Sequence, residues 1–518
     1  MAVPDVTTSL SAPSGAPTPS TVPAPAVPAP APENIPRALI GAIFATAILS
    51  FLGLLLETVL NVLFPALMSD FGIGMDDVSW MTTGYLLIVS VIMPLSGWLQ
   101  RRFTARSLFV AAALSVMAGA VIAALAPSYP ILLAGRLIQG VGTGIATPLM
   151  FTTILMQAPR SKVGSLMGVG ALVLGIAPAL GPTLGGVVGT VASWRVIFWG
   201  VVVLVAVALA IGIRCLTQPL PTVRERLAVD QLVLLAVGLA GLILGIERVA
   251  SLVGAGAGVG HWSVVAAIAL VAMGIAGMAG FVWRARRSDA PLLHLDVFRD
   301  RTYRWSLIAF AVLQFGTLGI GYIIPNYAQL ALGREAVVAG VIGLPGAVIG
   351  AAFAPLGGMI LDRMGPRRPI MAGGVIALAG AGMLGVLGLT GHLTIATLVL
   401  GNFVYMFGFG VAFANTQTHG MSGIAGRLTA DGTAVMNTAQ QFFGALSMTI
   451  LSSIIAAHQI GLTPGTPAYG TGTHDGATIG LLVVAGLVVL ALVAEARSFA
   501  APPSIDEGAP AAEFVAEA

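Results

Sequence analysis

Two ionisable residues stand where the chain is otherwise apolar, and the first of them is Glu57. It lies in the run FLGLLLETVLNVLFPAL, within an apolar stretch at about residues 38–68. A carboxylate at membrane depth costs a few kcal/mol or more, so it is by default a functional-site hypothesis. Polar and small residues recur there every three or four positions, which predicts one helical face turned toward a partner helix or a wet cavity: Thr46, Ser50, Gly53, Glu57 and Asn61. The alternative is a structural carboxylate tied to a neighbouring helix.

The second ionisable residue is Arg136, in the run LAGRLIQGVGTG at residues 133–144. A guanidinium stays charged at ordinary pH, so at membrane depth it needs a carboxylate or backbone carbonyls as partners. The nearest plausible carboxylate is Glu57, and a proton arriving there would switch the attraction off. The alternative is that Arg136 binds carbonyls and only fastens helices together.

The composition places these residues in a bilayer. Of the 518 residues, 57% are hydrophobic and 9% are charged, whereas a soluble protein carries about 25% charged residues. The single cysteine, Cys215, excludes an intrachain disulfide. We find no Walker loop, metal-ligand spacing or nucleophile elbow, so the sequence predicts no enzyme, no metal and no cofactor.

Fourteen segments are long and apolar enough to cross a membrane, which predicts an all-α polytopic membrane protein. Their approximate limits are 38–66, 78–100, 107–126, 130–152, 164–189, 195–216, 229–250, 262–283, 305–330, 336–361, 369–390, 393–416, 432–456 and 477–496. Most Lys and Arg residues fall in alternate loops, which predicts that those loops and both termini are cytoplasmic, in a cell membrane. The Pro/Ala-rich tail at 1–36 and the tail at 499–518 are expected to be disordered.

An internal repeat divides the chain. PLSGWLQRR at 94–102 ends the second span, and PLGGMILDR at 355–363 ends the tenth. We therefore expect two six-helix bundles, 37–220 and 291–498, joined by two inserted helices at 221–290. Repeats of this kind are typical of transporters, with the substrate site between the halves near the midplane.

These motifs resemble the major facilitator superfamily over about residues 37–498, and within it the fourteen-helix drug:proton antiporter branch. The run from Leu56 to Pro65 is similar to the acidic first-helix motif of that branch, closest in pattern to lincomycin-resistance-type multidrug exporters. The resemblance implies a proton-coupling role for Glu57. It also ties Arg136, followed by Gly140 in the same motif, to proton transfer.

The fifth span carries GIAPALGPTLGG at residues 175–186, which resembles the antiporter motif of the superfamily. Glycines four residues apart give a smooth face for close helix contact, and prolines bend a helix. We therefore predict a tight, bent seam between the halves, with a plain glycine-rich packing helix as the alternative. Its residues are Pro178, Gly181, Pro182, Gly185 and Gly186.

The repeated loops resemble the cytoplasmic gate of the family. The second copy matches at Gly358, Asp362, Arg363 and Arg367. The first copy keeps Gly97 and Arg102, but Arg101 stands where the family has an acid. Either the first-half gate is missing or another residue takes the place of that acid.

Polar residues in other spans are substrate-site candidates, although such a residue more often makes a helix–helix hydrogen bond than a ligand contact. They are Asn61, Gln314, Tyr322, Asn326, Asn402, Tyr405, Asn437 and Gln441. With nearby aromatic residues they predict a greasy, sparsely polar pocket.

The sequence thus predicts proton-coupled efflux of lipophilic, and in some cases cationic, drugs by alternating access. The expected partners are the bilayer, protons and a small-molecule substrate, without nucleic acid, and the chain is expected to be a monomer. Three alternatives stay open: an exporter of one endogenous metabolite, a nutrient symporter or facilitator of the same superfamily, and a non-transporting membrane sensor or scaffold.

Overall fold

The computed structural model describes residues 35–73, 75–218, 222–223, 226–255, 261–288, 290–463 and 465–500, and in this part of the chain it contains helices and no strand. Fourteen of the described segments are long and apolar enough to cross a membrane, which confirms the predicted fold class. In lipid the backbone has no water to bond, so it must satisfy its own N–H and C=O groups, and a helix does so within one segment. Both predicted tails lie almost wholly outside the described residues.

Six long helices form the first half. They are α1 (Arg37–Phe71), α2 (Met75–Arg102), α3 (Ala105–Ala124), α4 (Tyr129–Gln157), α5 (Val163–Val191) and α6 (Arg195–Cys215), with the short 3-10 helix η1 (Arg160–Lys162) before α5. Thr104 caps α3 by accepting a hydrogen bond from the Ser107 N–H, which ends the basic loop after α2. Within this half, α1 packs against α4, α5 and α6, and α4 packs against α2 and α3.

Two inserted helices follow, α7 (Val229–Ala255) and α8 (His261–Ala285). They meet along glycines whose backbones nearly touch: a Cβ on Gly241 would lie 2.6 Å from the Gly274 nitrogen, and one on Gly277 would lie 2.7 Å from the Gly238 nitrogen. Such small-residue seams hold membrane helices together by close packing. Helix α7 also packs against α2 and α14, so the pair contacts both halves.

The second half has seven helices in six spans. They are α9 (Arg301–Leu330), α10 (Ala336–Ile342), α11 (Leu344–Met364), α12 (Arg367–Leu389), α13 (Ile395–Ser422), α14 (Thr429–Gln459) and α15 (Pro467–Phe499), with 3-10 helices η3 (Leu295–Phe298) and η4 (Gly426–Leu428). The predicted span at 336–361 is interrupted at Gly343, between α10 and α11. Pro345 lacks an N–H and so cannot bond the Val341 carbonyl one turn earlier, which explains why the helix is interrupted here.

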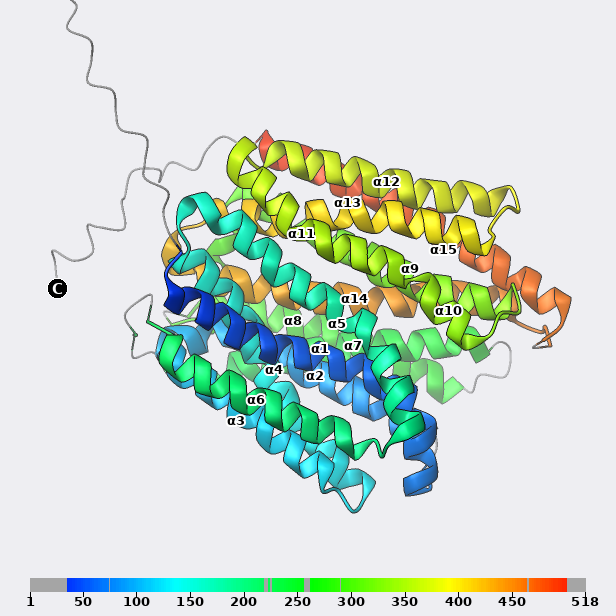
Figure 1. Ribbon diagram of the computed structural model, residues 1–518, viewed down its shortest axis with the longest axis horizontal. Helices are drawn as coiled ribbons and strands as arrows, with labels where there is room; N and C mark the ends of the chain where they lie inside the picture. Colours follow the sequence, from blue (N-terminus) through cyan, green and yellow to red (C-terminus); the bar gives the residue numbers. More distant parts are fainter. Residues whose placement is uncertain are drawn as a thin grey trace, which may run out of the picture. The chain divides into compact units, whose positions relative to one another are not determined.

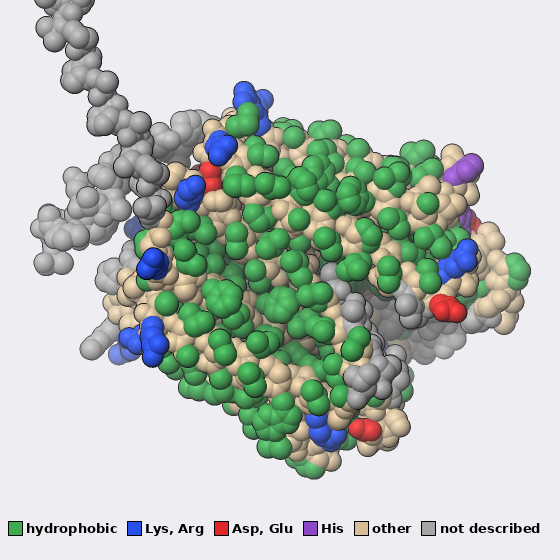
Figure 2. Space-filling view, in the orientation of Figure 1, with side chains coloured by type: hydrophobic (Ala, Val, Ile, Leu, Met, Phe, Trp, Pro, Cys, Tyr) green, Lys and Arg blue, Asp and Glu red, His purple; other side chains and the backbone are tan. Residues whose placement is uncertain are grey.

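The two halves meet along two equivalent pairs of helices. The second helix of the first half, α2, packs against the fifth helix of the second half, α14, and α5 packs against α11 in the same way. Figure 1 shows α5 running alongside α11. In Figure 2 apolar side chains cover the visible flank, whereas most of the blue Lys and Arg side chains gather at one end, the left. We call this the basic end.

Candidate functional site

Glu57 is half-buried on α1, where α1 lies close to α2 and α4. The close approach depends on Gly53, because a Cβ there would lie 2.8 Å from the Tyr85 hydroxyl and closer still to Thr143. Two other members of the predicted polar face serve the backbone instead: the Thr46 hydroxyl donates to the Ala42 carbonyl, and Ser50 donates to that of Thr46. The side chain of Asn61 lies outside the described residues.

Arg136 is fully buried on α4, with 0% of its surface exposed. Its Nη1 donates to Gln139 Oε1 at 2.8 Å, and its guanidinium carbon lies 4.2 Å from the centre of the Tyr85 ring. A desolvated cation over an aromatic face is stabilised by the ring quadrupole. Arg136 and Glu57 attract one another electrostatically but do not form a direct ion pair in the described structure. The two predicted partners therefore interact through their charges. Tyr85 and Gln139 are the residues that contact the Arg136 side chain directly.

The Arg136 site contains donors that lack acceptors. Arg136 Nε and Nη2 and Gln139 Nε2 are all buried without a hydrogen-bond partner. Buried polar groups are paired in most native structures, so an orphaned cluster needs an explanation. A carboxylate accepts several such bonds at once, and Glu57 is the carboxylate that interacts with this cluster.

Two motif glycines frame this site. A Cβ on Gly140 would lie 3.1 Å from Ile88 of α2, so this glycine brings α4 against the α2 backbone. Gly181 of α5 faces Thr58, and a Cβ there would lie 3.0 Å from the Val59 nitrogen. The predicted position of Gly181 between the halves is wrong, because it packs on α1, in the same half and beside Glu57. Gly185 is buried, and the surroundings of Pro178, Pro182 and Gly186 lie outside what the structure describes.

The seam between α5 and α11 lies nearer the start of α5. A Cβ on Gly168 would lie 2.7 Å from the Pro355 Cα and closer to the Ala354 carbonyl, and Gly358 approaches the Gly164 carbonyl more closely still. These helices meet backbone to backbone, so no side chain larger than hydrogen fits without a shift. Glycines do allow the close contact between the halves, but these are Gly164, Gly168 and Gly358 rather than Gly181.

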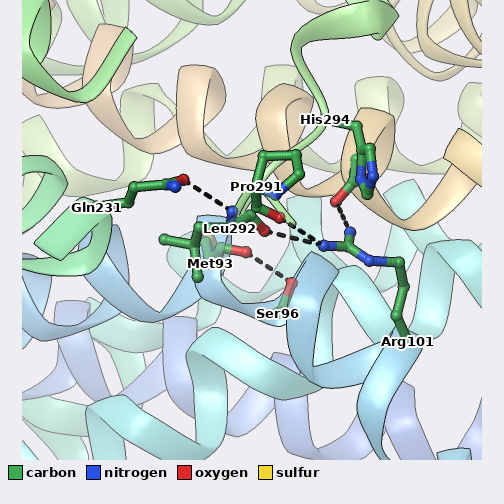
Figure 3. A network of polar contacts seen from close by, with 8 residues as sticks. Met93, Ser96, Arg101, Gln231, Pro291, Leu292 and His294 are labelled. Carbon is green, nitrogen blue, oxygen red and sulfur yellow. Dashed lines mark hydrogen bonds and ion pairs between the residues drawn. The ribbon is translucent and has the colours of Figure 1, made fainter. Parts of the chain in front are cut away.

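At the basic end Arg101 of α2 forms an ion pair with Asp431, in the first turn of α14. Asp431 is 0% exposed, and its other oxygen lies 2.9 Å from His294 Nδ1. A Cβ on Gly97 would lie 3.4 Å from the Asp431 Cα, so glycine makes room for the carboxylate. Figure 3 shows Arg101 and His294 converging on this point. Asp431 is thus the acid that Arg101 binds, and sequence reasoning missed it; the available signal was an acid in the first turn of a span.

The equivalent position of the second half holds a matching contact. Asp362, at the end of α11, accepts hydrogen bonds from the backbone N–H groups of Gly164 and Ser165 at 2.8 and 2.9 Å. A carboxylate at a helix N-terminus is stabilised by free N–H groups and by the helix dipole. We call the Arg101–Asp431 pair the α2–α14 latch and the Asp362 contact the α5–α11 latch. Arg363 and Arg367 are exposed beside the latter, and Arg102 lies over the Phe103 ring.

The substrate-site candidates separate into two groups. For Gln314 on α9 and Gln441 on α14 the described structure shows no hydrogen bond; Gln314 is buried and Gln441 is half-buried. Gln440, which sequence reasoning missed, is half-buried beside Gln441 and equally unbonded. The half-buried Tyr322 lies near Ser452 of α14.

The remaining candidates are already bonded to the protein. Tyr405 is fully buried and donates to the Leu313 carbonyl at 3.2 Å. Asn326 and Asn437 donate to carbonyls one turn earlier in their own helices, and Asn402 donates to the Gly343 carbonyl at the break between α10 and α11. In this conformation Tyr405 and Asn402 join helices of the second half, whereas Asn326 and Asn437 bond within their own helices.

A buried carboxylate on α15, Glu495, also escaped sequence reasoning. It is 2% exposed, and Ser498 donates to its Oε2 at 3.1 Å. Ser498 contacts His419 of α13 at 3.2 Å, so the three residues form a short polar chain inside the second half. The signal was an acid inside the last apolar span, comparable to Glu57 in the first.

The described residues form two matched sets of spans, with a buried charge site and with latches at one end. These features define a membrane transporter rather than an enzyme. The family model described as Major Facilitator Superfamily matches residues 46–448. The chain is 33% identical over 410 residues to the lincomycin resistance protein LmrB of Listeria monocytogenes, covering 79% of this chain and 85% of that protein. It is also 28% identical over 404 residues to a multidrug resistance protein B homolog of Mycobacterium tuberculosis, covering 78% of this chain and 73% of that one. The chain therefore belongs to the major facilitator superfamily.

Solved structures agree on the fold. The human organic anion transporter MFSD10 superposes with a TM-score of 0.60 at 15% identity, covering 88% of this chain and all of that chain. The proton:xylose symporter XylE superposes with a TM-score of 0.59 at 17% identity, covering 87% and 94%. At this identity the likeness concerns the fold alone.

Proposed function

We propose that the protein exports lipophilic small molecules across the cell membrane in exchange for protons, by alternating access. The observation that carries the proposal is the fully buried Arg136, with two unpaired N–H groups and an electrostatic attraction to Glu57. A buried charge without a full set of partners is costly, so a state in which Glu57 binds Arg136 directly is favoured whenever Glu57 is ionised. Relatives named for lincomycin and multidrug resistance support drug export.

The two latches support the assignment of this conformation within the cycle. Both join the halves at the basic end, which the positive-inside rule places in the cytoplasm together with both termini. The two latches, which are the polar bridges between the halves described above, both lie at this end. The conformation is thus the one closed to the cytoplasm, in which Glu57 takes up a proton from outside.

The cycle then follows from charge. A proton on Glu57 removes its attraction for Arg136, and the halves rock so that the latches open and the outer end closes. Loss of the proton to the cytoplasm restores the attraction, and drug leaves outward on the return. One proton entering supplies about 2.3 kcal/mol per 100 mV of membrane potential and about 1.4 kcal/mol per pH unit. This is enough to sustain an outward drug gradient of about tenfold or more.

Glu57→Gln tests the proposal. The amide keeps the size of the side chain but takes up no proton, so export driven by a pH gradient in proteoliposomes should stop while drug binding persists. Glu335→Gln is a matched control, because Glu335 is exposed outside the spans. Uphill export by Glu57→Gln at the wild-type rate would contradict the proposal.

A further inference from the structure

The segment that joins the inserted helices to the second half takes part in the α2–α14 latch. Besides its ion pair with Asp431, Arg101 donates from Nη2 to the carbonyls of Pro291 and Leu292, both at 3.2 Å. The Leu292 N–H is held in turn by Gln231 Oε1 of α7 at 2.9 Å. Figure 3 shows Gln231 reaching Leu292 from the side opposite Arg101. One arginine therefore binds the other half and the linker together.

The segment that contains Leu292 and Leu293 is also held by apolar packing. Leu292 and Leu293 are buried in one cluster with Trp98 of α2, Leu239 of α7 and Phe281 of α8. Partly buried Val435 and Phe442 of α14 close the cluster on the far side. A fully buried leucine contributes about 2 kcal/mol. The halves cannot separate at the basic end without disturbing this packing.

His294 completes the arrangement. It lies three residues beyond Pro291, and its Nδ1 contacts Asp431 Oδ2, so Asp431 is bound by Arg101 from α2 and by His294 from the linker. Tyr303 of α9 is the other titratable group that faces Asp431, and its hydroxyl donates to the neighbouring Gly432 carbonyl at 2.8 Å. Of these groups, histidine is the one whose charge ordinarily changes between about pH 5 and 8.

We propose that the inserted helices and segment 290–294 are a pH-dependent clamp on the cytoplasmic gate, with His294 as its proton-sensing residue. An imidazolium at position 294 adds a second cation to Asp431 and stabilises the closed gate. A neutral imidazole keeps one hydrogen bond but loses the charge, so the gate opens more readily as the cytoplasmic pH rises. The transporter is thereby slowed when the cytoplasm is acidic. The proposal rests on the alternating access proposed above, but not on proton coupling through Glu57.

The test measures gate opening directly. Ser161, before α5, and Ser422, at the end of α13, are exposed serines in different halves at the basic end. Spin labels on Ser161→Cys and Ser422→Cys, with Cys215→Ser to remove the native thiol, report the distance across the gate in lipid nanodiscs. The labelled protein also carries Glu57→Gln, which removes the proposed proton-coupling residue. Neither substrate nor a gradient is needed.

Between pH 6 and 8 we expect the closed-to-open ratio to fall about three- to fivefold, the effect of one added ion pair. His294→Gln should abolish this dependence, and His294→Lys should keep the gate closed at both pH values. The matched control is His392→Gln, because His392 is exposed between α12 and α13. It should retain the wild-type response.

Gln231→Leu tests the linker independently of charge. It leaves the Leu292 N–H without its acceptor, so the closed fraction should fall at both pH values while the pH dependence remains. A wild-type pH response in His294→Gln, or no response in the parent protein, would overturn the clamp. Because the background lacks Glu57, either result is independent of whether export is proton-driven.

Discussion

Arg101 and Asp362 occupy equivalent positions of the repeated motif, yet one carries a cation and the other an anion. Arg101 binds the Asp431 carboxylate, whereas Asp362 binds the backbone N–H groups of Gly164 and Ser165. Both contacts join the end of one helix to the start of a helix in the opposite half. The polarity is reversed in the first half, where the cation stands at the end of α2 and the acid at the start of α14. The two latches therefore differ in chemistry.

The α2–α14 latch is expected to show strong coupling between its two charges. Arg101→Gln removes the arginine partner of the buried Asp431, and Asp431→Asn removes the anionic partner of Arg101, each at a cost of about 3 kcal/mol. The double variant should lose much less than the sum, with an interaction energy of about 1–3 kcal/mol. Thermal unfolding of the purified single and double variants measures the cycle. The exposed Arg284–Asp230 pair is the control, and additive effects at Arg101 and Asp431 would argue against a latch.

Closure of the basic end should depend on Gly168. Gly168→Ala forces a methyl group against the Ala354 carbonyl and Pro355. Overpacking of this kind costs about 1–3 kcal/mol, so the equilibrium should shift about five- to 100-fold toward the cytoplasm-open state. Spin-label distances between Ser161→Cys and Ser422→Cys measure the shift. Gly200→Ala on α6 has open space around it and should change nothing.

Tyr85 should matter for its ring rather than for its hydroxyl. The Arg136 guanidinium lies over this ring, and a desolvated cation–π contact is worth about 2 kcal/mol. Tyr85→Leu should therefore slow export about 30-fold, whereas Tyr85→Phe should stay near the wild-type rate. Initial export rates in inverted vesicles provide the measurement. Equal losses in the two variants would assign the effect to the hydroxyl instead.

Substrate choice should respond to the unbonded amides and not to the bonded polar groups. Gln441→Ala removes an amide that makes no described hydrogen bond, so it should change the susceptibility profile by up to about tenfold for some drugs and not others. Tyr405→Phe removes a hydroxyl bonded to Leu313, so it should lower the thermal midpoint by a few degrees with the profile unchanged. A susceptibility panel compared with thermal unfolding separates the two outcomes. A changed profile in Tyr405→Phe would place that residue in the pocket.

The spans were predictable from sequence because each is set by a local property, a run of about 20 apolar residues. The break at Gly343 was not, since a short glycine and proline pair inside an apolar run leaves the hydropathy unchanged. Glu57 and Arg136 were also predictable, because a charge in such a run stands out on its own. Their attraction is present, although the contacts with Tyr85 and Gln139 required the structure.

The gate shows why the rest could not be predicted. Arg101 was visible as a departure from the family motif, but its partner Asp431 lies 330 residues further along the chain. An aspartate in a first helical turn is common wherever a helix begins, so it carries no sign of a distant arginine. Gly181 was assigned to the wrong neighbour for the same reason: glycine spacing identifies a smooth face but not the helix that covers it.

The two latches differ in how easily a mutation breaks them, because the α5–α11 latch uses backbone N–H groups as its donors. Nearly every residue type supplies an N–H group, so substitutions at Ser165 other than proline leave a donor for Asp362. The α2–α14 latch is lost when either of two codons changes its charge. Variants selected for altered drug tolerance should therefore accumulate around Arg101, His294 and Asp431, while the start of α5 tolerates polar exchange.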